Sequence, residues 1–352
     1  MKKHNFSAGP SILPQEVLAQ ASKAILNFNN LDLSLLEISH RSADFVAVME
    51  KAQSLALDLL GLTGKGYTAL FLQGGASLEF LMAPYNLLRE NGKSAYLDSG
   101  TWASAAIKEA KYLGEVVVVA SSKDKNYSYV PKGYAIPSDA DYFHCTSNNT
   151  IFGTQLKDFP KTDIPMVCDM SSDIFSRKLD FSKFALIYAG AQKNMGPAGT
   201  TLVVVKDEIL GKTGRNIPSM LNYQTHITKE SMHNTPPVFA VYVSMLTLQW
   251  LKDLGGIEAI EKINDAKAKL LYDEIDRNPN LTGTAANEDR SHMNVTFLVN
   301  DPEKAAAFDK NCKEAGISGI KGHKSVGGYR ASIYNAMPLE SVQVLVDVMK
   351  KI

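Results

Sequence analysis

Short apolar runs rich in β-branched and aromatic residues recur along the first 205 residues of the chain. Most are apolar throughout and do not alternate with polar residues, which is typical of strands in a sheet covered by helices on both faces. The pattern therefore predicts an α/β fold built on a mostly parallel, seven-stranded sheet. The expected strands cover residues 67–72, 94–98, 115–120, 141–145, 165–169, 185–189 and 200–205.

Longer stretches with helical periodicity alternate with these runs and predict the helices that cover the sheet. Ser11 and Pro14 supply a start signal for the first helix. The expected helices cover residues 14–27, 43–60, 77–90, 102–113, 237–254 and 257–277.

The pattern changes after about residue 260, where strands and helices no longer alternate regularly. Gly255 and Gly256 interrupt the helical periodicity just before this change. We therefore expect a large domain at 1–258, which includes the N-terminal segment, and a small α+β domain at 259–352. The small domain is expected to contain, after a long helix, a strand at 293–299, a helix near 302–315, a strand around 328–333 and a last helix from 338.

Amino-acid composition and charge limit the kinds of molecule that this protein is expected to bind. The 352 residues are 45% hydrophobic, and 37 basic side chains balance 37 acidic ones. This balance gives no electrostatic footprint for nucleic acid or an anionic membrane, so small molecules or a second copy of the chain are the expected partners. The N-terminal MKKHNFSAGPSILP lacks the apolar core of a secretory signal, and no apolar run approaches 18 residues. We expect a cytoplasmic protein.

The sequence lacks the motifs of disulfide frameworks, structural zinc sites and common nucleotide-binding sites. Three widely spaced cysteines without a CxxC pair argue against a disulfide framework and against a structural zinc site, so no metal is expected. Neither the G-x-G-x-x-G fingerprint nor the P-loop pattern occurs, which weakens the case for a nucleotide-binding protein.

Polar residues follow three of the predicted strands at the sheet edge where ligands bind in open α/β folds. The first group is the segment QGGAS at 73–77, which leads directly into a helix. Its amides could bind a phosphate group at the helix N-terminus. A tight turn with a serine cap would explain the same residues.

Asp169 and Lys193 follow two later strands and would lie at the same edge. A buried carboxylate needs a partner, which a cap or an ion pair could supply. Lys193 sits among small residues that leave room for a ligand, and a desolvated lysine is a nucleophile able to form a Schiff base. Pyridoxal phosphate is a cofactor that would need all three features. Its aldehyde would bond the lysine, its ring nitrogen would pair with the carboxylate, and its phosphate would bind at the helix N-terminus.

Five segments closely resemble the phosphoserine aminotransferase family, a class-V group of pyridoxal phosphate enzymes with the type I transferase fold. The resemblance extends almost from end to end, and two of the matches are long. The segments are NFSAGPSILP at 5–14, EISHR at 37–41, YAGAQKNMGPAG at 188–199, HNTPP at 233–237 and KGHKSVGGYRASIYNAMP at 321–338.

The resemblance implies roles for the residues around the cofactor ring. Lys193 would form the Schiff base, and Asp169 would pair with the pyridine nitrogen. Trp102 would stack on the ring, although the start of a helix is also an ordinary place for a core aromatic residue. Thr150 is similar to the family threonine that hydrogen-bonds near the ring hydroxyl.

The resemblance also assigns the cofactor phosphate to both subunits of a homodimer. Ala76 and Ser77 would bind it with help from Gln192, although some family members carry arginine where Ser77 stands. Asn234 and Thr235 would reach it from the other subunit, although taken alone their proline-rich segment is typical of a helix start. Each active site would then be completed across the dimer interface.

The resemblance also implies which residues bind the two anionic groups of each substrate. Arg330 resembles the arginine that holds the α-carboxylate, a contact that a planar guanidinium makes with two hydrogen bonds. Ser7 could line the pocket, or it could be an ordinary loop serine. Lys324 departs from the arginine of many members and would contact phosphate as a point charge. The cluster for the substrate phosphate, or for the side-chain carboxylate of glutamate, would be His40, Arg41, His323 and Lys324, which could also be ordinary surface charges.

The implied reaction is a ping-pong transamination between L-glutamate and 3-phosphohydroxypyruvate in serine biosynthesis. The family is also associated with a related phosphorylated hydroxythreonine substrate in pyridoxine biosynthesis. Three alternatives remain. A cysteine desulfurase would need a reactive cysteine on a mobile loop, whereas Cys312 lies in a helical segment. An alanine–glyoxylate type aminotransferase would not need the four-cation cluster. A binding module without catalysis would need neither Lys193 nor Asp169.

Overall fold

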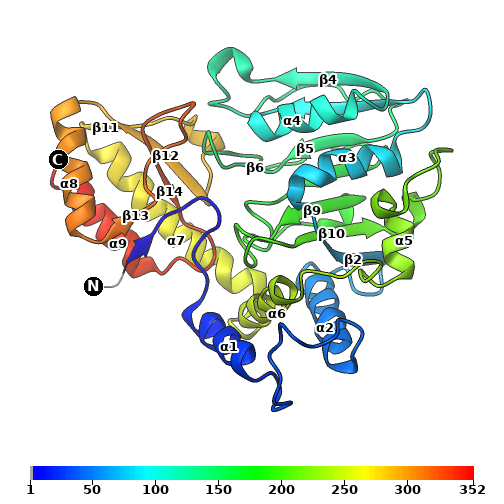
Figure 1. The fold of residues 1–352 in the computed structure, drawn as a ribbon. Helices are drawn as coiled ribbons and strands as arrows, with labels where there is room; N and C mark the ends of the chain where they lie inside the picture. Colours follow the sequence, from blue (N-terminus) through cyan, green and yellow to red (C-terminus); the bar gives the residue numbers. More distant parts are fainter. Residues whose placement is uncertain (1–2) are drawn as a thin grey trace.

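The computed structural model describes residues 3–352 and contains a large and a small sheet that lie side by side (Figure 1). All seven predicted strands form the large sheet, and only β10 runs antiparallel to its neighbours. The prediction of a mostly parallel seven-stranded sheet is therefore confirmed. The strand order is β2 (Tyr67–Leu72), β10 (Thr201–Lys206), β9 (Leu186–Gly190), β8 (Met166–Asp169), β5 (Phe143–Thr146), β3 (Lys93–Asp98) and β4 (Glu115–Ser121).

Helices cover both faces of this sheet, as the unbroken apolar runs predict. Ala69 and Phe71 of β2 pack into a core with α2, α6 and the start of α7, whereas Leu70 and Leu72 pack against α3 and α4. The edge strand β4 is the exception, because its Val118 is 43% exposed. These helices are α1 (Gln15–Leu26), α2 (Ala43–Leu59), α3 (Gly75–Leu87), α4 (Thr101–Ala110), α6 (Val238–Asp253) and α7 (Gly256–Arg277).

A second core lies in the C-terminal part of the chain. The antiparallel sheet β11 (Leu281–Gly283), β12 (Asn294–Val299) and β14 (Tyr329–Ser332) packs with α8 (Pro302–Glu314) and α9 (Leu339–Met349). The N-terminal strand β1 (His4–Asn5) joins this part by pairing with β13 (Ile317–Ser318), and Phe6 is buried in the same core.

Helix α7 belongs to both cores. Ile257 and Ile260 pack into the core of the large sheet, whereas Leu271 and Ile275 pack into the second core. In Figure 1 the helix runs from the large sheet to the small one. A domain boundary between residues 258 and 259 therefore remains a prediction, and α7 is a structural element shared by the two parts.

The sequence pattern does not predict the shortest elements, because strands of two or three residues and a helix of six show too little periodicity. The unpredicted strands and helix are β1, β6 (Asn148–Asn149), β7 (Thr154–Gln155), β11, β13 and α5 (Tyr223–Thr228). The 3₁₀ helices are Lys123–Lys125, Phe181–Lys183, Asp207–Ile209, Ser219–Leu221 and Asn287–Asp289.

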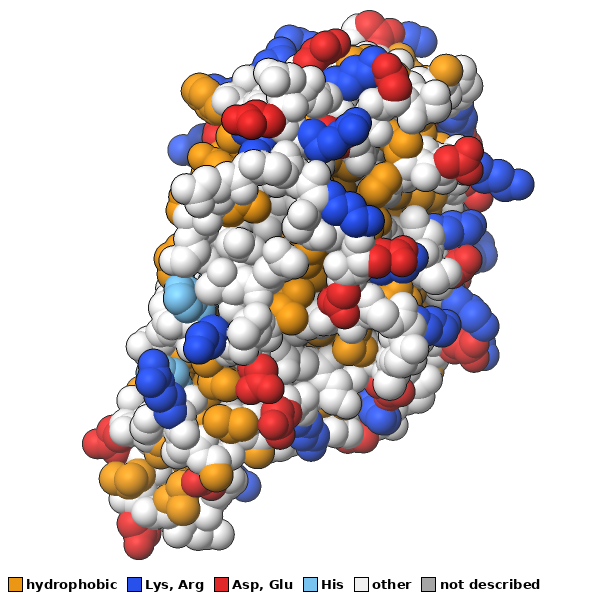
Figure 2. All heavy atoms as spheres, turned by 90° about the vertical axis from the view of Figure 1, so that its right-hand side faces the viewer, with side chains coloured by type: hydrophobic (Ala, Val, Ile, Leu, Met, Phe, Trp, Pro, Cys, Tyr) orange, Lys and Arg blue, Asp and Glu red, His pale blue; other side chains and the backbone are white. Residues whose placement is uncertain are grey.

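The surface carries both signs of charge. On the face shown in Figure 2, Lys and Arg side chains are interspersed with Asp and Glu. Within residues 3–352, every helix is too short or too polar to cross a lipid bilayer.

Candidate active site

The site lies where the carboxyl ends of β8 and β9 meet the small sheet. Asp169 is the last residue of β8 and pairs in register with Tyr188 of β9. Directly after Gly190, the end of β9, the chain turns tightly, and the amide of Gly196 donates to the carbonyl of Ala191. This turn carries Lys193 back toward Asp169.

The Lys193 side chain is half-buried and has two predicted site residues as neighbours. Its Nζ donates a 2.8 Å hydrogen bond to Oγ1 of Thr150 and lies 5.5 Å from the centroid of the Trp102 ring. Burial lowers the pKa of Lys193 to about 8; Asp169 opposes this shift, and Arg330 adds to it. A large fraction of the amine is therefore in the neutral, nucleophilic form near pH 8.

Asp169 is 5% exposed, and its Oδ1 accepts a 2.9 Å hydrogen bond from the Ser171 amide. Burial raises the pKa of Asp169, whereas Lys193 and the hydrogen bonds from Ser171 lower it. Within residues 3–352 no cationic group forms an ion pair with it at 4.0 Å or less. The ion-pair explanation for this buried carboxylate is therefore wrong, and a cationic ligand nitrogen is the partner that its position suits.

The N-terminus of α3 begins at a glycine. Its N-cap is Gly74, with φ of +97°, and among the residues that the structure describes no side chain caps the first amides of the helix. The alternative of a serine cap by Ser77 is therefore wrong. A Cβ atom on Gly74 would lie 2.5 Å from Leu78, so this position excludes a larger residue. With Ala76 half-buried and Ser77 exposed, the amides of this turn fit an anion such as a phosphate group.

Trp102 packs in the core, and its ring also lies near Lys193. The residue is the second of α4, and its half-buried ring packs against the core beneath α3 and α4. The ring also lies under the Lys193 amine, and its Nε1 has no hydrogen-bond partner among residues 3–352. This indole can therefore form one wall of a ligand site while it completes the core.

Arg330 reaches the site from β14 of the small sheet. Its Nη1 donates a 3.3 Å hydrogen bond to the carbonyl of Thr150, and in the described part of the chain its Nε has no hydrogen-bond partner. Burial lowers the pKa of Arg330, and within residues 3–352 no carboxylate forms an ion pair with it. A half-buried guanidinium without a counter-ion is a ready site for a carboxylate ligand.

Contacts of the remaining predicted residues do not show what they bind. Gln192 is half-buried, and its main-chain carbonyl accepts from the amide of Ser11 at 3.0 Å. Ser7 is half-buried, and its amide donates to Asn5 Oδ1 at 3.1 Å. Gln73 Nε2 donates to the carbonyl of Thr235 at 2.5 Å, which holds the loop of Asn234 against the end of β2. The structure leaves the roles of these residues as predictions.

The four predicted cations lie on two segments that are far apart in the sequence. Arg41 Nε donates to His40 Nε2 at 3.4 Å, and His323 Nδ1 bonds the Ser325 hydroxyl at 2.7 Å. All four residues lie at or near the surface, and Lys324 is exposed. Their grouping into one anion site stays a prediction.

Two serines in contact with the site were not predicted. Ser171 supports Asp169, and its hydroxyl also accepts from the Gly190 amide at 3.2 Å. Ser11 donates its hydroxyl to the carbonyl of Lys193 and so fixes the lysine turn from the N-terminal segment. Ser11 lies inside the NFSAGPSILP segment, but a start signal for the first helix was the only role that the pattern suggested.

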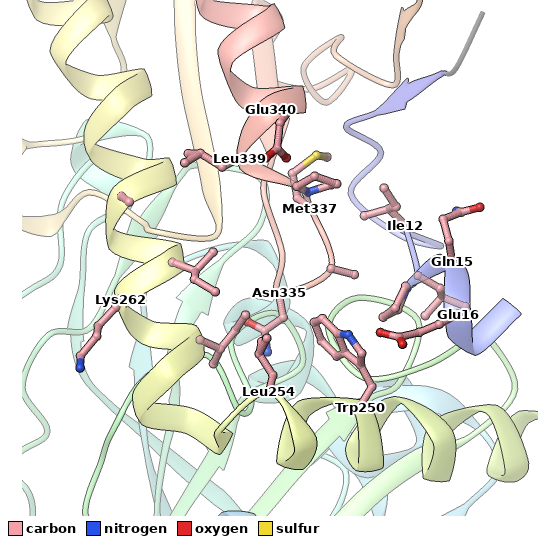
Figure 3. Close-up of a pocket in the computed structure, with 17 residues that line it drawn as sticks. Ile12, Gln15, Glu16, Trp250, Leu254, Lys262, Asn335, Met337, Leu339 and Glu340 are labelled. Atoms are coloured by element: carbon pink, nitrogen blue, oxygen red, sulfur yellow. The ribbon is translucent and has the colours of Figure 1, made fainter.

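A separate apolar cavity of about 620 Å³ lies between α1, the α6–α7 junction and the start of α9 (Figure 3). Trp250, Leu254 and Met337 line it. None of the predicted site residues does, so the cavity is distinct from the lysine site.

Comparisons with known proteins identify the family of this chain. The sequence model described as Aminotransferase class-V matches residues 3–345. The phosphoserine aminotransferase of Flavobacterium johnsoniae is 77% identical over 350 residues, which cover 99% of this chain and 98% of that protein.

Two solved structures have closely similar folds. The phosphoserine aminotransferase from Bacillus circulans subsp. alkalophilus has a TM-score of 0.96 at 44% identity, covering 99% of this chain and 98% of that one. The pyridoxal phosphate-bound phosphoserine aminotransferase from Trichomonas vaginalis has a TM-score of 0.94 at 35% identity, with 99% and 100% covered. This chain therefore belongs to the class-V aminotransferases, in the phosphoserine aminotransferase family.

Proposed function

We propose that this chain transfers the amino group of L-glutamate to 3-phosphohydroxypyruvate, giving 2-oxoglutarate and O-phospho-L-serine. One observation carries the proposal. The amine of Lys193 and the guanidinium of Arg330 both bond Thr150, at 2.8 Å and 3.3 Å, and neither forms an ion pair within residues 3–352. A nucleophilic amine beside a free carboxylate-binding group is what transamination of an α-amino acid needs.

The residues of the site fit pyridoxal phosphate. Lys193 would hold its aldehyde, Trp102 and Thr150 would contact its ring, and Asp169 would face its ring nitrogen. The uncapped amides at Ala76 and Ser77 would hold its phosphate, with Gln192 nearby. When bound, the cofactor withdraws electrons from the substrate α-carbon and so makes the proton there removable.

Proton transfer falls to Lys193. With a pKa near 8, its amine can accept a proton near neutral pH and return it on the other side of the transfer. The hydrogen bond to Thr150 orients Nζ beside the Trp102 ring. A cationic ring nitrogen would hold Asp169 in its charged form, although burial alone raises the pKa of this carboxyl.

Substrate binding is divided between two groups of cations. Arg330 would bind the α-carboxylate that both amino acid and keto acid substrates share. The phosphate of one substrate and the side-chain carboxylate of the other would take turns on the four-cation cluster. Ser7 would line the entrance.

A homodimer would bring the halves of that cluster together. The segment before His40 and Arg41 exposes several large apolar side chains, with Leu26 83% and Leu36 61% exposed. Such a patch is typical of a protein interface. We propose that a second copy covers it and that Asn234 and Thr235 contact the cofactor phosphate of the partner site.

The substrate assignment is tested by assaying the purified protein with glutamate and either phosphohydroxypyruvate or glyoxylate. Activity with phosphohydroxypyruvate supports the proposal, whereas activity with glyoxylate alone overturns it. The same assay with phosphohydroxythreonine as amino donor asks whether the chain also has the pyridoxine-pathway reaction. A role in serine biosynthesis follows from the first activity, and a cytoplasmic location stays a prediction for cell fractionation.

Two other functions are less well supported. A cysteine desulfurase needs a reactive thiol, but Cys145, Cys168 and Cys312 are all buried, and burial raises the pKa of Cys312 to about 12. A binding module without catalysis would not need the Lys193 amine. It predicts a colourless protein that cannot be reconstituted with pyridoxal phosphate, whereas the enzyme should be yellow and its Lys193→Ala variant should lose that colour.

A further inference from the structure

Lys267 is a fully buried lysine outside the site described above. It lies on α7 with 0% of its surface exposed, and its Nζ donates a 2.7 Å hydrogen bond to the main-chain carbonyl of Tyr334. Within residues 3–352 no carboxylate forms an ion pair with it. A buried amine is costly, and an apolar side chain of similar length would fill the space with less desolvation. Within the described chain, the bond to the Tyr334 carbonyl is the polar contact of Lys267. We therefore infer that its role is to hold residue 334 in place.

A second side chain of α7 holds the next residue. Asn264, one turn before Lys267, is 1% exposed and donates to Oδ1 of Asn335 at 2.9 Å and to the carbonyl of Ser176 at 3.0 Å. Asn335 points toward α7 from the segment that leads into α9 (Figure 3). One face of α7 thus clamps the two consecutive residues 334 and 335.

Both clamped residues contact the neighbours of Lys193. The amide of Asn335 donates to Oδ1 of Asn194, the residue after Lys193, at 2.9 Å. The phenol of Tyr334 donates to the carbonyl of Ala8 at 2.7 Å, and Thr150 lies close enough to lower its pKa against the effect of burial. The clamp therefore reaches both sides of the lysine site.

The clamped segment is also the continuation of β14, which carries Arg330. Tyr334 lies four residues beyond Arg330, and their charges affect each other's pKa. The carbonyl of Thr150 fixes only one nitrogen of the Arg330 guanidinium. The direction of the guanidinium therefore depends on where the end of β14 is held.

We propose that Lys267 is a positioning residue for substrate binding: by holding the carbonyl of Tyr334, it sets Arg330 at the distance from Lys193 that an α-carboxylate requires. This inference rests on the proposed function, because it takes Arg330 as the carboxylate-binding group. It assigns no contact between Lys267 and substrate or cofactor.

The test compares Lys267→Met, which keeps the chain length and removes the donor, with Lys269→Met as control. Lys269 is on the same helix, with its side chain 74% exposed in an ion pair with Asp273. In Lys267→Met the KM for glutamate and for phosphohydroxypyruvate should rise about tenfold, because the loss of one buried hydrogen bond misplaces a group that binds ground state and transition state alike. The kcat should stay within about twofold, and the control should match the wild type.

Equilibrium binding to the cofactor-loaded protein separates positioning from general loosening. The Kd of 2-oxoglutarate should rise by a similar factor, whereas the Kd of inorganic phosphate should not change, because the phosphate cations do not depend on residue 334. Equal weakening of both ligands, or an unchanged KM, would overturn the inference.

If Lys267→Met does not fold, the variant Lys267→Gln still tests whether Lys267 positions Arg330. Lys267→Gln keeps an amide donor at a shorter reach, and it should fold and show an intermediate KM. If this variant folds with the wild-type KM while it has lost thermal stability, the role of Lys267 is structural only and the inference fails. Failure of the proposed function is distinguishable, since the wild-type protein itself would then lack activity with phosphohydroxypyruvate.

Discussion

Thr150 Oγ1 accepts a 2.8 Å hydrogen bond from Lys193 Nζ, and this contact joins the turn between β6 and β7 to the turn after β9. The carbonyl of the same threonine accepts from Arg330 at 3.3 Å. One buried residue therefore sets the positions of both the amine and the guanidinium that the proposed reaction needs.

Thr150→Val should remove the hydroxyl while it keeps the shape of the side chain. The Lys193 amine would lose its only hydrogen bond within residues 3–352, so kcat/KM should fall about tenfold. Steady-state assays with glutamate and phosphohydroxypyruvate measure the effect. Thr228→Val, at an exposed position of α5, serves as the control and should behave as the wild type.

Arg330→Lys should keep a positive charge and lose the two-pronged contact with a carboxylate. We expect the KM of both substrates to rise by about tenfold to a hundredfold, since a bidentate pair is worth more than a point charge. The matched control is Arg277→Lys, whose side chain is 65% exposed. An unchanged KM for glutamate would show that another group binds the α-carboxylate.

The depressed pKa of Lys193 predicts how stability depends on pH in the cofactor-free protein. Its folded pKa of about 8 lies below the ordinary 10.5, so the unfolded chain binds this proton more tightly than the folded chain does. Below about pH 8, burial of the protonated amine therefore lowers the free energy of unfolding by its full amount. This loss of stability disappears as the pH rises toward 10.5.

Urea unfolding of wild type and Lys193→Met measures this dependence. The free energy of unfolding of the wild type, relative to the variant, should increase between about pH 8 and pH 10.5. The buried Lys267 is present in both proteins, so its own titration cancels in the difference. A difference that stays flat across this range would mean that the Lys193 amine is not desolvated.

The exposed leucines before Arg41 predict a dimer. Leu36 is 61% exposed, and a charge at this position should disfavour burial in an interface. Sedimentation should give the mass of two chains for the wild type and of one chain for Leu36→Asp. Leu298→Asp, at a 40% exposed position of the small sheet, is the control and should remain a dimer. A wild-type protein that sediments as a single chain contradicts the proposal.

Much of the fold can be predicted from the sequence because the strands of the large sheet are buried on both faces. Their unbroken apolar runs mark all seven of them, including β10, although nothing in its sequence shows that it runs antiparallel. Strands of two residues, such as β6, carry no such signal. The positions of Asp169 and Lys193 follow from strand ends alone, because β8 and β9 are parallel neighbours.

Contacts between distant segments are harder to predict. Ser11 bonds a residue 182 positions away, and no local pattern encodes that distance. Lys267 did carry a signal, because it falls on the apolar stripe of its helix between Ile260 and Leu271, where a lysine is unexpected. The four predicted cations come from segments more than 280 residues apart, and no local pattern shows whether the two segments meet.

The central claim is that the amine of Lys193 binds the aldehyde of pyridoxal phosphate. Borohydride reduction of the cofactor-loaded protein, followed by proteolysis and mass spectrometry, tests it directly. The account predicts a pyridoxyl label on the peptide that contains Lys193, and on no other lysine. A label on a different lysine, or no label on a protein that shows transaminase activity, would contradict it.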